Sequence, residues 1–204
     1  MTKATTKVIG ITGPSGAGKS LFRSFLEQQG FPCIDADGVY HDLLIPPSVC
    51  LDHLRQAFGD SVFQSDGSLD RKALGEIVFH DPKQLDLLNN TVLPYVLDQI
   101  RNLIGQNASA SLVFVDAPTL IESGFHLECD AVISILAEEE TRAERIAKRD
   151  HLSINQAHTR IHAQQPDSFY IDHSDYVLQN DGDQESFLAQ SELILRKLME
   201  KESS

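Results

Sequence analysis

Short continuous apolar runs alternate with longer stretches of helical spacing along this chain of 204 residues. Short apolar runs, rich in Val and Ile and bounded by turn residues, are typical of strands that a parallel sheet buries on both faces. The pattern therefore predicts an α/β domain with five strands. We expect these strands at residues 8–12, 31–34, 111–116, 131–136 and 175–180.

Residues 46–106 follow a different pattern, because their apolar residues recur only at helical spacing. An Asp66-Gly67 turn separates the first two helical runs, and Asp70-Arg71 is expected to open the second. We predict a helical insertion on the α/β core, a place that usually carries substrate specificity. The recurring positions are Leu51, Leu54 and Phe58, then Leu74, Ile77 and Val78, and then Leu85, Leu88, Val92, Val96 and Ile100.

Two further helices are predicted after the fourth strand. Glu138-Glu139-Glu140 opens the first, which ends in Lys148-Arg149 and so matches the helix dipole, and a second helix follows through Gln164. No acidic residue lies three or four positions from Arg145 or Arg149, which share a face with Arg142. This pattern favours phosphate binding by Arg145 and Arg149 over a salt-bridged solvated face. We expect the two helices to form a lid.

Residues 13–20, Gly-Pro-Ser-Gly-Ala-Gly-Lys-Ser, match the phosphate-binding pattern GxxxxGK[ST] and stand between a predicted strand and a predicted helix. Glycines let backbone N–H groups face an anion, and the helix N-terminus adds its positive dipole end. Lys19 is expected to reach the β- and γ-phosphates and Ser20 to bind Mg²⁺. The alternative is a tight turn in a Rossmann-like unit. The predicted nucleotide-binding residues are Gly13, Pro14, Ser15, Gly16, Ala17, Gly18, Lys19, Ser20, Leu21, Arg145 and Arg149.

Acidic residues lie at the ends of the second and third predicted strands and in the segments that follow them. Asp35 ends the second strand, so we expect it beside the phosphate loop, where the ligand crevice of a parallel sheet lies. Asp116 ends the third strand, in the position of a magnesium-binding Asp. Capping is the alternative for both, and an N-cap role is the leading interpretation of Asp37. Glu122 either orients substrate or closes its loop.

The composition narrows the classes of function that the chain can have. A net charge of −13 argues against general binding of nucleic acid or anionic membranes, and requires a phosphate-binding protein to concentrate its cations in one place. Residues 1–7 do not resemble a signal peptide and no apolar run is long enough to span a bilayer, so we expect a cytoplasmic protein. Cys33, Cys50 and Cys129 are expected to be reduced. The eight histidines are interpreted as lacking metal-ligand spacing.

Taken together, these motifs resemble the dephospho-coenzyme A kinase family along nearly the whole chain. The loop alone is shared by many kinases, but the ordered set is far more specific. Besides the loop, the matching pieces are residues 34–37, residues 66–71 with Leu74, Val78-Phe79, Leu88-Asn89, Asp116-Ala117-Pro118 with Leu120 and Glu122, Arg145 with Arg149, Arg160-Ile161 with Gln164, and Asp175-Tyr176-Val177 with Asn180.

The resemblance implies ATP-dependent phosphorylation of the ribose 3′-hydroxyl of dephospho-coenzyme A, with ATP and Mg²⁺. It also implies a three-layer P-loop fold with a five-stranded parallel sheet of order 2-3-1-4-5. The implied core is residues 1–45, 107–140 and 174–204, with an acceptor-binding insertion at 46–106 and a lid at 141–173. The implied catalytic residues are Asp35 as the base, Lys19 and Arg145. The implied acceptor-binding residues are Asp35, Asp37, Arg71, Pro94, Pro118 and Glu122. The implied metal-binding residues are Ser20 and Asp116.

Two departures from the family pattern stand out. Leu93 precedes Pro94 where the family usually has His, and residues 167–172 contain no basic residue. We expect a monomer or a weak homo-oligomer. One alternative is another nucleoside or nucleotide kinase, such as a uridine-kinase-like enzyme. Others are an inactive binding homologue and a GTP-dependent switch, although no Asn-Lys-x-Asp guanine motif is present.

Overall fold

The computed structural model describes residues 6–200 and divides the chain into two compact units. Unit 1 comprises residues 1–34 and 107–204, and unit 2 comprises residues 35–106. The expected absence of a signal peptide concerns residues that lie mostly outside the described range. Within that range, no helix combines the length and apolar character needed to cross a membrane.

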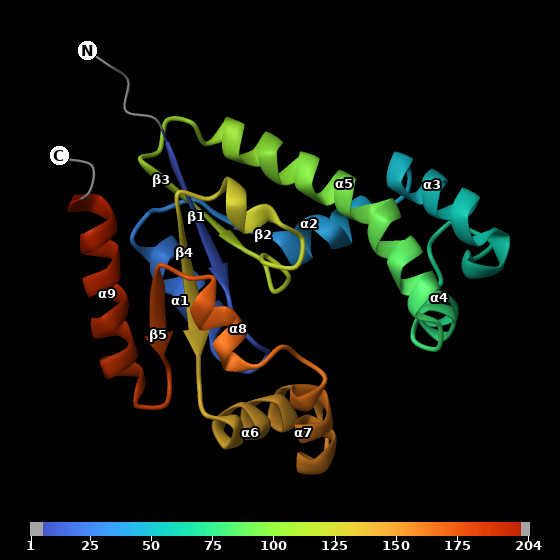
Figure 1. Ribbon diagram of the computed structural model, residues 1–204. Coiled ribbons are helices and arrows are strands. Elements are labelled where there is room, and N and C mark those ends of the chain that lie inside the picture. The colour runs from blue at the N-terminus through green and yellow to red at the C-terminus, as the bar shows by residue number, and fades with distance from the viewer. Residues whose placement is uncertain (1–5, 201–204) are drawn as a thin grey trace. The chain divides into compact units, whose positions relative to one another are not determined.

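Unit 1 is built on a parallel sheet in the order β2-β3-β1-β4-β5, which confirms the predicted topology (Figure 1). The strands are β1 (Lys7–Thr12), β2 (Cys33–Asp35), β3 (Leu112–Asp116), β4 (Ala131–Leu136) and β5 (Tyr176–Gln179). Central β1 pairs with β3 and β4, with Ile11 opposite both Asp116 and Ile133. Every residue of β3 and β4 is buried, which explains their unbroken apolar sequences.

Helices α1 (Lys19–Gln28) and α9 (Gln184–Glu200) cover one face of this sheet. Phe22 and Leu26, one turn apart on α1, are fully buried there with Phe187 of α9. Truncating a buried Phe to Ala typically costs about 3–5 kcal/mol, so these side chains are a main source of stability. On the opposite face, Leu120 packs so closely over Gly10 that a Cβ there would lie 2.5 Å from a Leu120 methyl group.

The two helices predicted to form a lid follow β4 in unit 1 and lie at the carboxyl end of that strand (Figure 1). They are α6 (Glu139–Asp150) and α7 (Ile154–His162), and α6 packs on α7 through Ala143, Ile146, Ala157 and Ile161. Ser153 and Gln156 form a capping box that fixes the start of α7. A short helix that the sequence pattern does not predict, α8 (Asp167–Asp172), comes next and buries Tyr170.

Unit 2 is helical, as its spacing predicts. It contains α2 (Ala36–Leu43), α3 (Val49–Phe58), α4 (Arg71–Val78) and α5 (Pro82–Gln106), and a short η1 (Asp60–Val62) lies between α3 and α4. Val92, Val96 and Ile100 form the buried stripe of α5, whereas Leu85 near its start is exposed. Unit 1 also contains a short 3₁₀ helix, η2 (Phe125–Glu128), between β3 and β4.

Candidate functional site

Residues 13–18 form a tight loop between β1 and α1, and two of its glycines are required by their surroundings. Gly13 and Gly18 have φ values of 133° and 109°, which side-chain-bearing residues rarely adopt. A Cβ at Gly13 would lie 2.1 Å from the Ile135 carbonyl oxygen, and one at Gly18 would lie 2.1 Å from Nδ2 of Asn180. The loop therefore fits closely against β4 and the segment after β5 only because these positions lack side chains.

The start of α1 presents the groups that an anion needs. The helix begins at Lys19, directly after Gly18, which offers no side-chain cap to its first N–H groups. The Lys19 ammonium lies over the loop and donates to the carbonyl oxygens of Gly13, at 2.6 Å, and Pro14, at 3.2 Å. Ser20 is exposed and Leu21 half-buried on the first turn. This strand–loop–helix unit has the geometry of a phosphate-binding site.

Arg145 and Arg149 of α6 both reach this loop. The Arg145 guanidinium donates to the carbonyl oxygens of Gly16, at 3.2 Å, and Asn180, at 3.0 Å, and also to that of Ala17. Arg149 donates to the Ser15 hydroxyl at 3.3 Å. Two guanidinium groups of α6 and one ammonium therefore converge on eight residues of an otherwise acidic chain.

Arg149 has an acidic partner that helical spacing does not reveal, because no acidic residue lies three or four positions from it. The neighbouring Asp150 accepts from Arg149 at 2.7 and 2.8 Å and from Arg160 at 2.6 Å. The hydrogen bond from Arg149 lowers the pKa of the Asp150 carboxyl and in turn raises that of Arg149. Spacing rules for a helix surface consider positions three and four apart and miss a contact between adjacent side chains. Asp150 thus offsets part of the charge that Arg149 brings to the loop.

Two residues absent from the predicted nucleotide-binding set form hydrogen bonds with the loop backbone. Gln164, which follows α7, accepts a hydrogen bond from the Ser15 N–H through Oε1 at 3.1 Å. The buried Asn180 donates from Nδ2 to the Ala17 carbonyl oxygen at 2.7 Å. Both residues belong to the matching pieces of the family pattern, so that pattern was the signal that could have identified them.

Asp116 is the last residue of β3. In the sheet it lies opposite Ile11, which is two residues before Gly13. Its buried side chain pairs with the Arg23 guanidinium of α1 at 3.4 Å, a contact that the sequence does not predict. Beyond it, the Pro118 carbonyl oxygen accepts from the Thr12 hydroxyl at 3.4 Å. Glu122 is exposed; its charge adds to burial, the larger effect, in raising the pKa of Tyr170 to about 12.

In unit 2, the helix is capped by Asp35 and not by Asp37, for which an N-cap role was the leading interpretation. Asp35 is the N-cap of α2, because its Oδ1 accepts from the Asp37 N–H at 3.1 Å, and Asp37 lies within the first turn. Asp70, by contrast, caps α4 as predicted. Arg71, the first residue of α4, lies 2.7 Å from Nδ1 of His41 on α2.

Leu93 and Pro94 lie on α5 within unit 2 and line an open pocket of about 640 Å³. Its wall also includes Tyr95, whose hydroxyl forms a hydrogen bond with Nδ1 of His53. An apolar Leu93 therefore occupies a surface hollow of this unit at the position where the family pattern has His. The remaining lining residues are Asn90, Leu97, Asp98 and Arg101.

Comparison with known proteins shows which family the chain belongs to. The dephospho-CoA kinase family model matches residues 7–186. A dephospho-CoA kinase of Enterococcus faecalis is 32% identical over 181 residues, which are 88% of this chain and 91% of that protein. The chain belongs to the dephospho-CoA kinase family.

Solved structures agree with membership of the dephospho-CoA kinase family. A crystal structure of a Thermus thermophilus protein is 30% identical with a TM-score of 0.82, covering 95% of this chain and 98% of that one. A dephospho-CoA kinase from Campylobacter jejuni is 26% identical with a TM-score of 0.67, covering 94% and 96%. The family resemblance and the P-loop kinase fold predicted from the sequence are therefore confirmed, and the chain is a kinase.

Proposed function

We propose that this kinase transfers the γ-phosphoryl group of ATP to the ribose 3′-hydroxyl of dephospho-coenzyme A, giving coenzyme A and ADP. The observation that carries the proposal is the convergence of Lys19, Arg145 and Arg149 on one glycine loop in a member of this family. We further infer that it acts in the cytoplasm as a monomer or weak homo-oligomer, without nucleic acid or membrane.

The loop and lid cations have one electrostatic task. In phosphoryl transfer, charge spreads over the equatorial oxygens of the moving group, and catalysis is mainly positioning plus stabilisation of that charge. Lys19 and the loop amides would bind the β- and γ-phosphates, and Arg145 would neutralise charge from the lid side. Gln164 and Asn180 hold the loop backbone in place, so we assign them positioning roles. A lid over the phosphates would also exclude competing water.

The residues at the end of β3 and the start of α1 fit Mg²⁺, which prefers oxygen ligands and commonly keeps several waters. The Ser20 hydroxyl is exposed at the start of α1, and Asp116 supplies a carboxylate whose position is held by Arg23. We propose that Ser20 binds the ion directly and Asp116 through water. When bound, Mg²⁺ would neutralise phosphate charge.

Acceptor binding is assigned to residues of unit 2 and of the segment after β3. Asp35 would accept the proton of the ribose hydroxyl, or chiefly orient that hydroxyl if the transition state is loose. Arg71, placed at the start of α4 beside His41, would contact the acceptor's phosphates. The other proposed contacts are Asp37, Pro94, Pro118 and Glu122.

A substrate panel tests this proposal. ADP release would be measured with dephospho-coenzyme A, uridine and nucleoside monophosphates as acceptors, each with and without Mg²⁺. We expect rapid Mg²⁺-dependent release only with dephospho-coenzyme A. Faster turnover of uridine or a nucleoside monophosphate would replace the proposed acceptor, and an absence of turnover with every acceptor would refute the proposed activity.

A further inference from the structure

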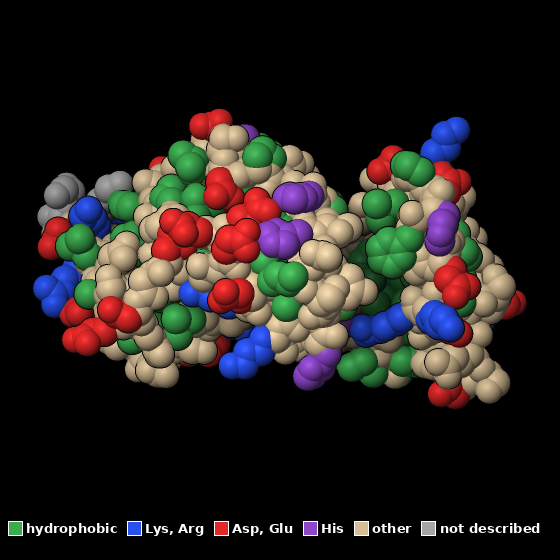
Figure 2. Space-filling view, turned by 90° about the horizontal axis from the view of Figure 1, so that it is seen from below, with side chains coloured by type: hydrophobic (Ala, Val, Ile, Leu, Met, Phe, Trp, Pro, Cys, Tyr) green, Lys and Arg blue, Asp and Glu red, His purple; other side chains and the backbone are tan. Residues whose placement is uncertain are grey.

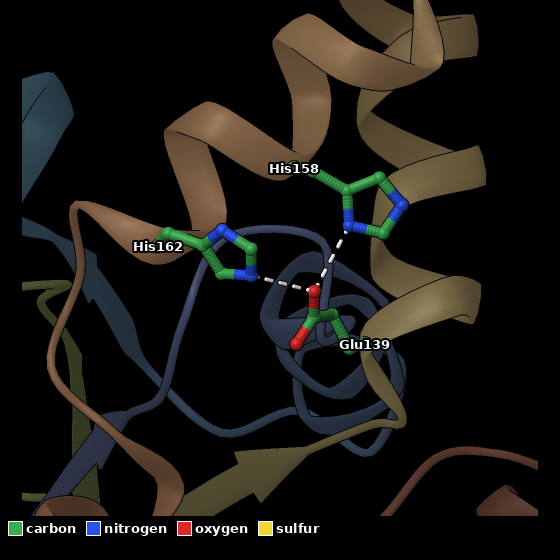
Figure 3. Close-up of side chains that lie close together, drawn as sticks. All are labelled: Glu139, His158 and His162. Atoms are coloured by element: carbon green, nitrogen blue, oxygen red, sulfur yellow. Dashed lines mark hydrogen bonds and ion pairs between the residues drawn. The ribbon is translucent and has the colours of Figure 1, made fainter.

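Three side chains of α6 and α7 lie close together outside the phosphate loop. Glu139 is the first residue of α6, and His158 and His162 lie one turn apart on α7. Oε1 of Glu139 lies 2.9 Å from Nδ1 of His158 and 2.8 Å from Nε2 of His162 (Figure 3). One ligand atom from each residue therefore lies within 4.8 Å of the others.

We propose that Glu139, His158 and His162 form a binding site for one divalent transition-metal ion of the zinc type. Two imidazoles and a carboxylate are a common ligand set for zinc, which takes further water in an open site. Histidines four residues apart on one helix are spaced to bind the same ion. The spacing of His158 and His162 therefore differs from the expectation that the histidines lack metal-ligand spacing.

The present distances are close to those that such an ion requires. Zinc binds imidazole nitrogen and carboxylate oxygen at about 2.0–2.2 Å, so tetrahedral ligand atoms lie about 3.3 Å apart. The observed contacts of 2.8 and 2.9 Å would need to open by only about 0.5 Å. Glu139 and His162 are well exposed, so rotation of their side chains can supply this movement.

Glu140 lies beside the second ring nitrogen of His158, where it could orient that histidine as a ligand. Its Oε2 lies 3.5 Å from Nε2 of His158, whereas Glu139 contacts Nδ1 of the same ring. A carboxylate in that place would accept the Nε2 proton and leave Nδ1 of His158 to bind the ion. Such carboxylate–histidine pairs behind a metal fix the tautomer and orientation of the ligand.

The site is chemically distinct from the proposed Mg²⁺ site. Two imidazole nitrogens favour zinc, copper or nickel over magnesium, which prefers oxygen ligands. On the face that Figure 2 shows, histidine side chains lie beside acidic ones and are accessible to solvent. An ion here would join the first turn of α6 to α7, and α6 also carries Arg145 and Arg149. We infer that it stiffens the lid.

The test uses the full chain after removal of metal by a chelator. Titration with Zn²⁺ in competition with a chromophoric chelator, at neutral pH and with millimolar Mg²⁺ present, should show one tight equivalent. His158→Ala or His162→Ala should weaken it by more than about 100-fold, whereas Glu140→Gln, which removes only an orienting group, should cost about 10-fold. The matched control is His80→Ala, which alters an exposed histidine of unit 2 and should change nothing.

A second measurement on the unaltered protein does not depend on how the variants fold. Co²⁺ bound in place of Zn²⁺ should give the intense visible bands of a four- or five-coordinate site with nitrogen ligands. A weak octahedral spectrum, or tight Zn²⁺ binding that survives the double change His158→Ala and His162→Ala, would overturn the proposal. Because both readouts are independent of catalysis, their failure would leave the proposed kinase activity unaffected.

Discussion

Asp35 caps a helix and is also the proposed general base. It is the last residue of β2, and its Oδ1 caps α2 by accepting the N–H of Asp37. Capping holds the side chain in a defined position, which a group that must meet a substrate hydroxyl also needs. Asn caps a helix about as well as Asp, but it is not a base. The two tasks can therefore be separated by substitution.

Asp35→Asn is expected to reduce turnover by about 10²–10⁴-fold, the usual contribution of a general base, while ATP binding is largely unchanged. The melting temperature should also stay close to that of the unaltered protein. Asp35→Ala should lose the same activity and, in addition, about 1 kcal/mol of stability from the lost cap. Steady-state kinetics and thermal unfolding measure both effects, and near-native turnover of Asp35→Asn would remove the base assignment.

The cysteines give a prediction about pH. Burial raises the pKa values of Cys33 and Cys129 to about 12 and also raises that of Cys50. An unfolded thiol ionises near pH 8.5, so between that pH and about 12 the unfolded chain binds fewer protons. The free energy of unfolding should therefore fall as pH rises through this range. Alkylation at pH 8 should be slow in native protein and rapid in denaturant, and rapid native alkylation would contradict the assignment.

At the scale of the element, α6 carries three arginines in different environments. Arg142 is buried and pairs with Asp167 at 3.4 Å, and Arg149 is partly neutralised by Asp150. Arg145 donates to backbone carbonyl oxygens, which lie in the phosphate loop and at Asn180. One helix thus divides its cations between an ion pair with α8 and contacts with the phosphate loop.

Arg145→Lys keeps the charge but loses the planar fork that reaches several acceptors at once. We expect turnover to fall by about 10²-fold, with a smaller loss for Arg149→Ala, because Asp150 already offsets the Arg149 charge. Arg196→Lys is the matched control, since Arg196 is an exposed residue of α9 paired with Glu192. Kinetics on the three variants test this order, and equal activity of Arg145→Lys and the control would contradict it.

The elements also show what sequence reasoning can and cannot reach. Buried parallel strands such as β3 and β4 are predictable because each is an unbroken apolar run, and Lys19 was assigned from a contiguous motif. Six-residue α8 is too short to show helical periodicity. The contacts of Gln164 with Ser15 and of His158 with Glu139 join different elements, so they depend on how the chain folds.

At the scale of the molecule, a chain with net charge −13 gathers Lys19, Arg145 and Arg149 around one loop of unit 1. The site concentrates cations where phosphate would bind, while the excess of acidic residues elsewhere discourages binding of other polyanions. A polyanionic nucleotide bound there would relieve repulsion among these cations and hold the lid to the loop.

ATP should therefore stabilise unit 1. At a ligand concentration of about 100 times Kd, binding adds about 2.7 kcal/mol, or roughly 5–10 °C in melting temperature for a chain of this size. Hydrogen exchange should slow in the loop and in α6 and α7, but not in α9. Lys19→Ala should lose most of this shift, and an equal shift in that variant would show that nucleotide binds elsewhere.

The identity of the product tests the central claim most directly. Purified protein would be incubated with ATP, Mg²⁺ and dephospho-coenzyme A, and phosphorus NMR with tandem mass spectrometry would locate the transferred group. We predict a single new phosphomonoester on the ribose 3′-oxygen, formed in equal amount with ADP. Phosphate at another position, or ADP released without any phosphorylated acceptor, would contradict the account.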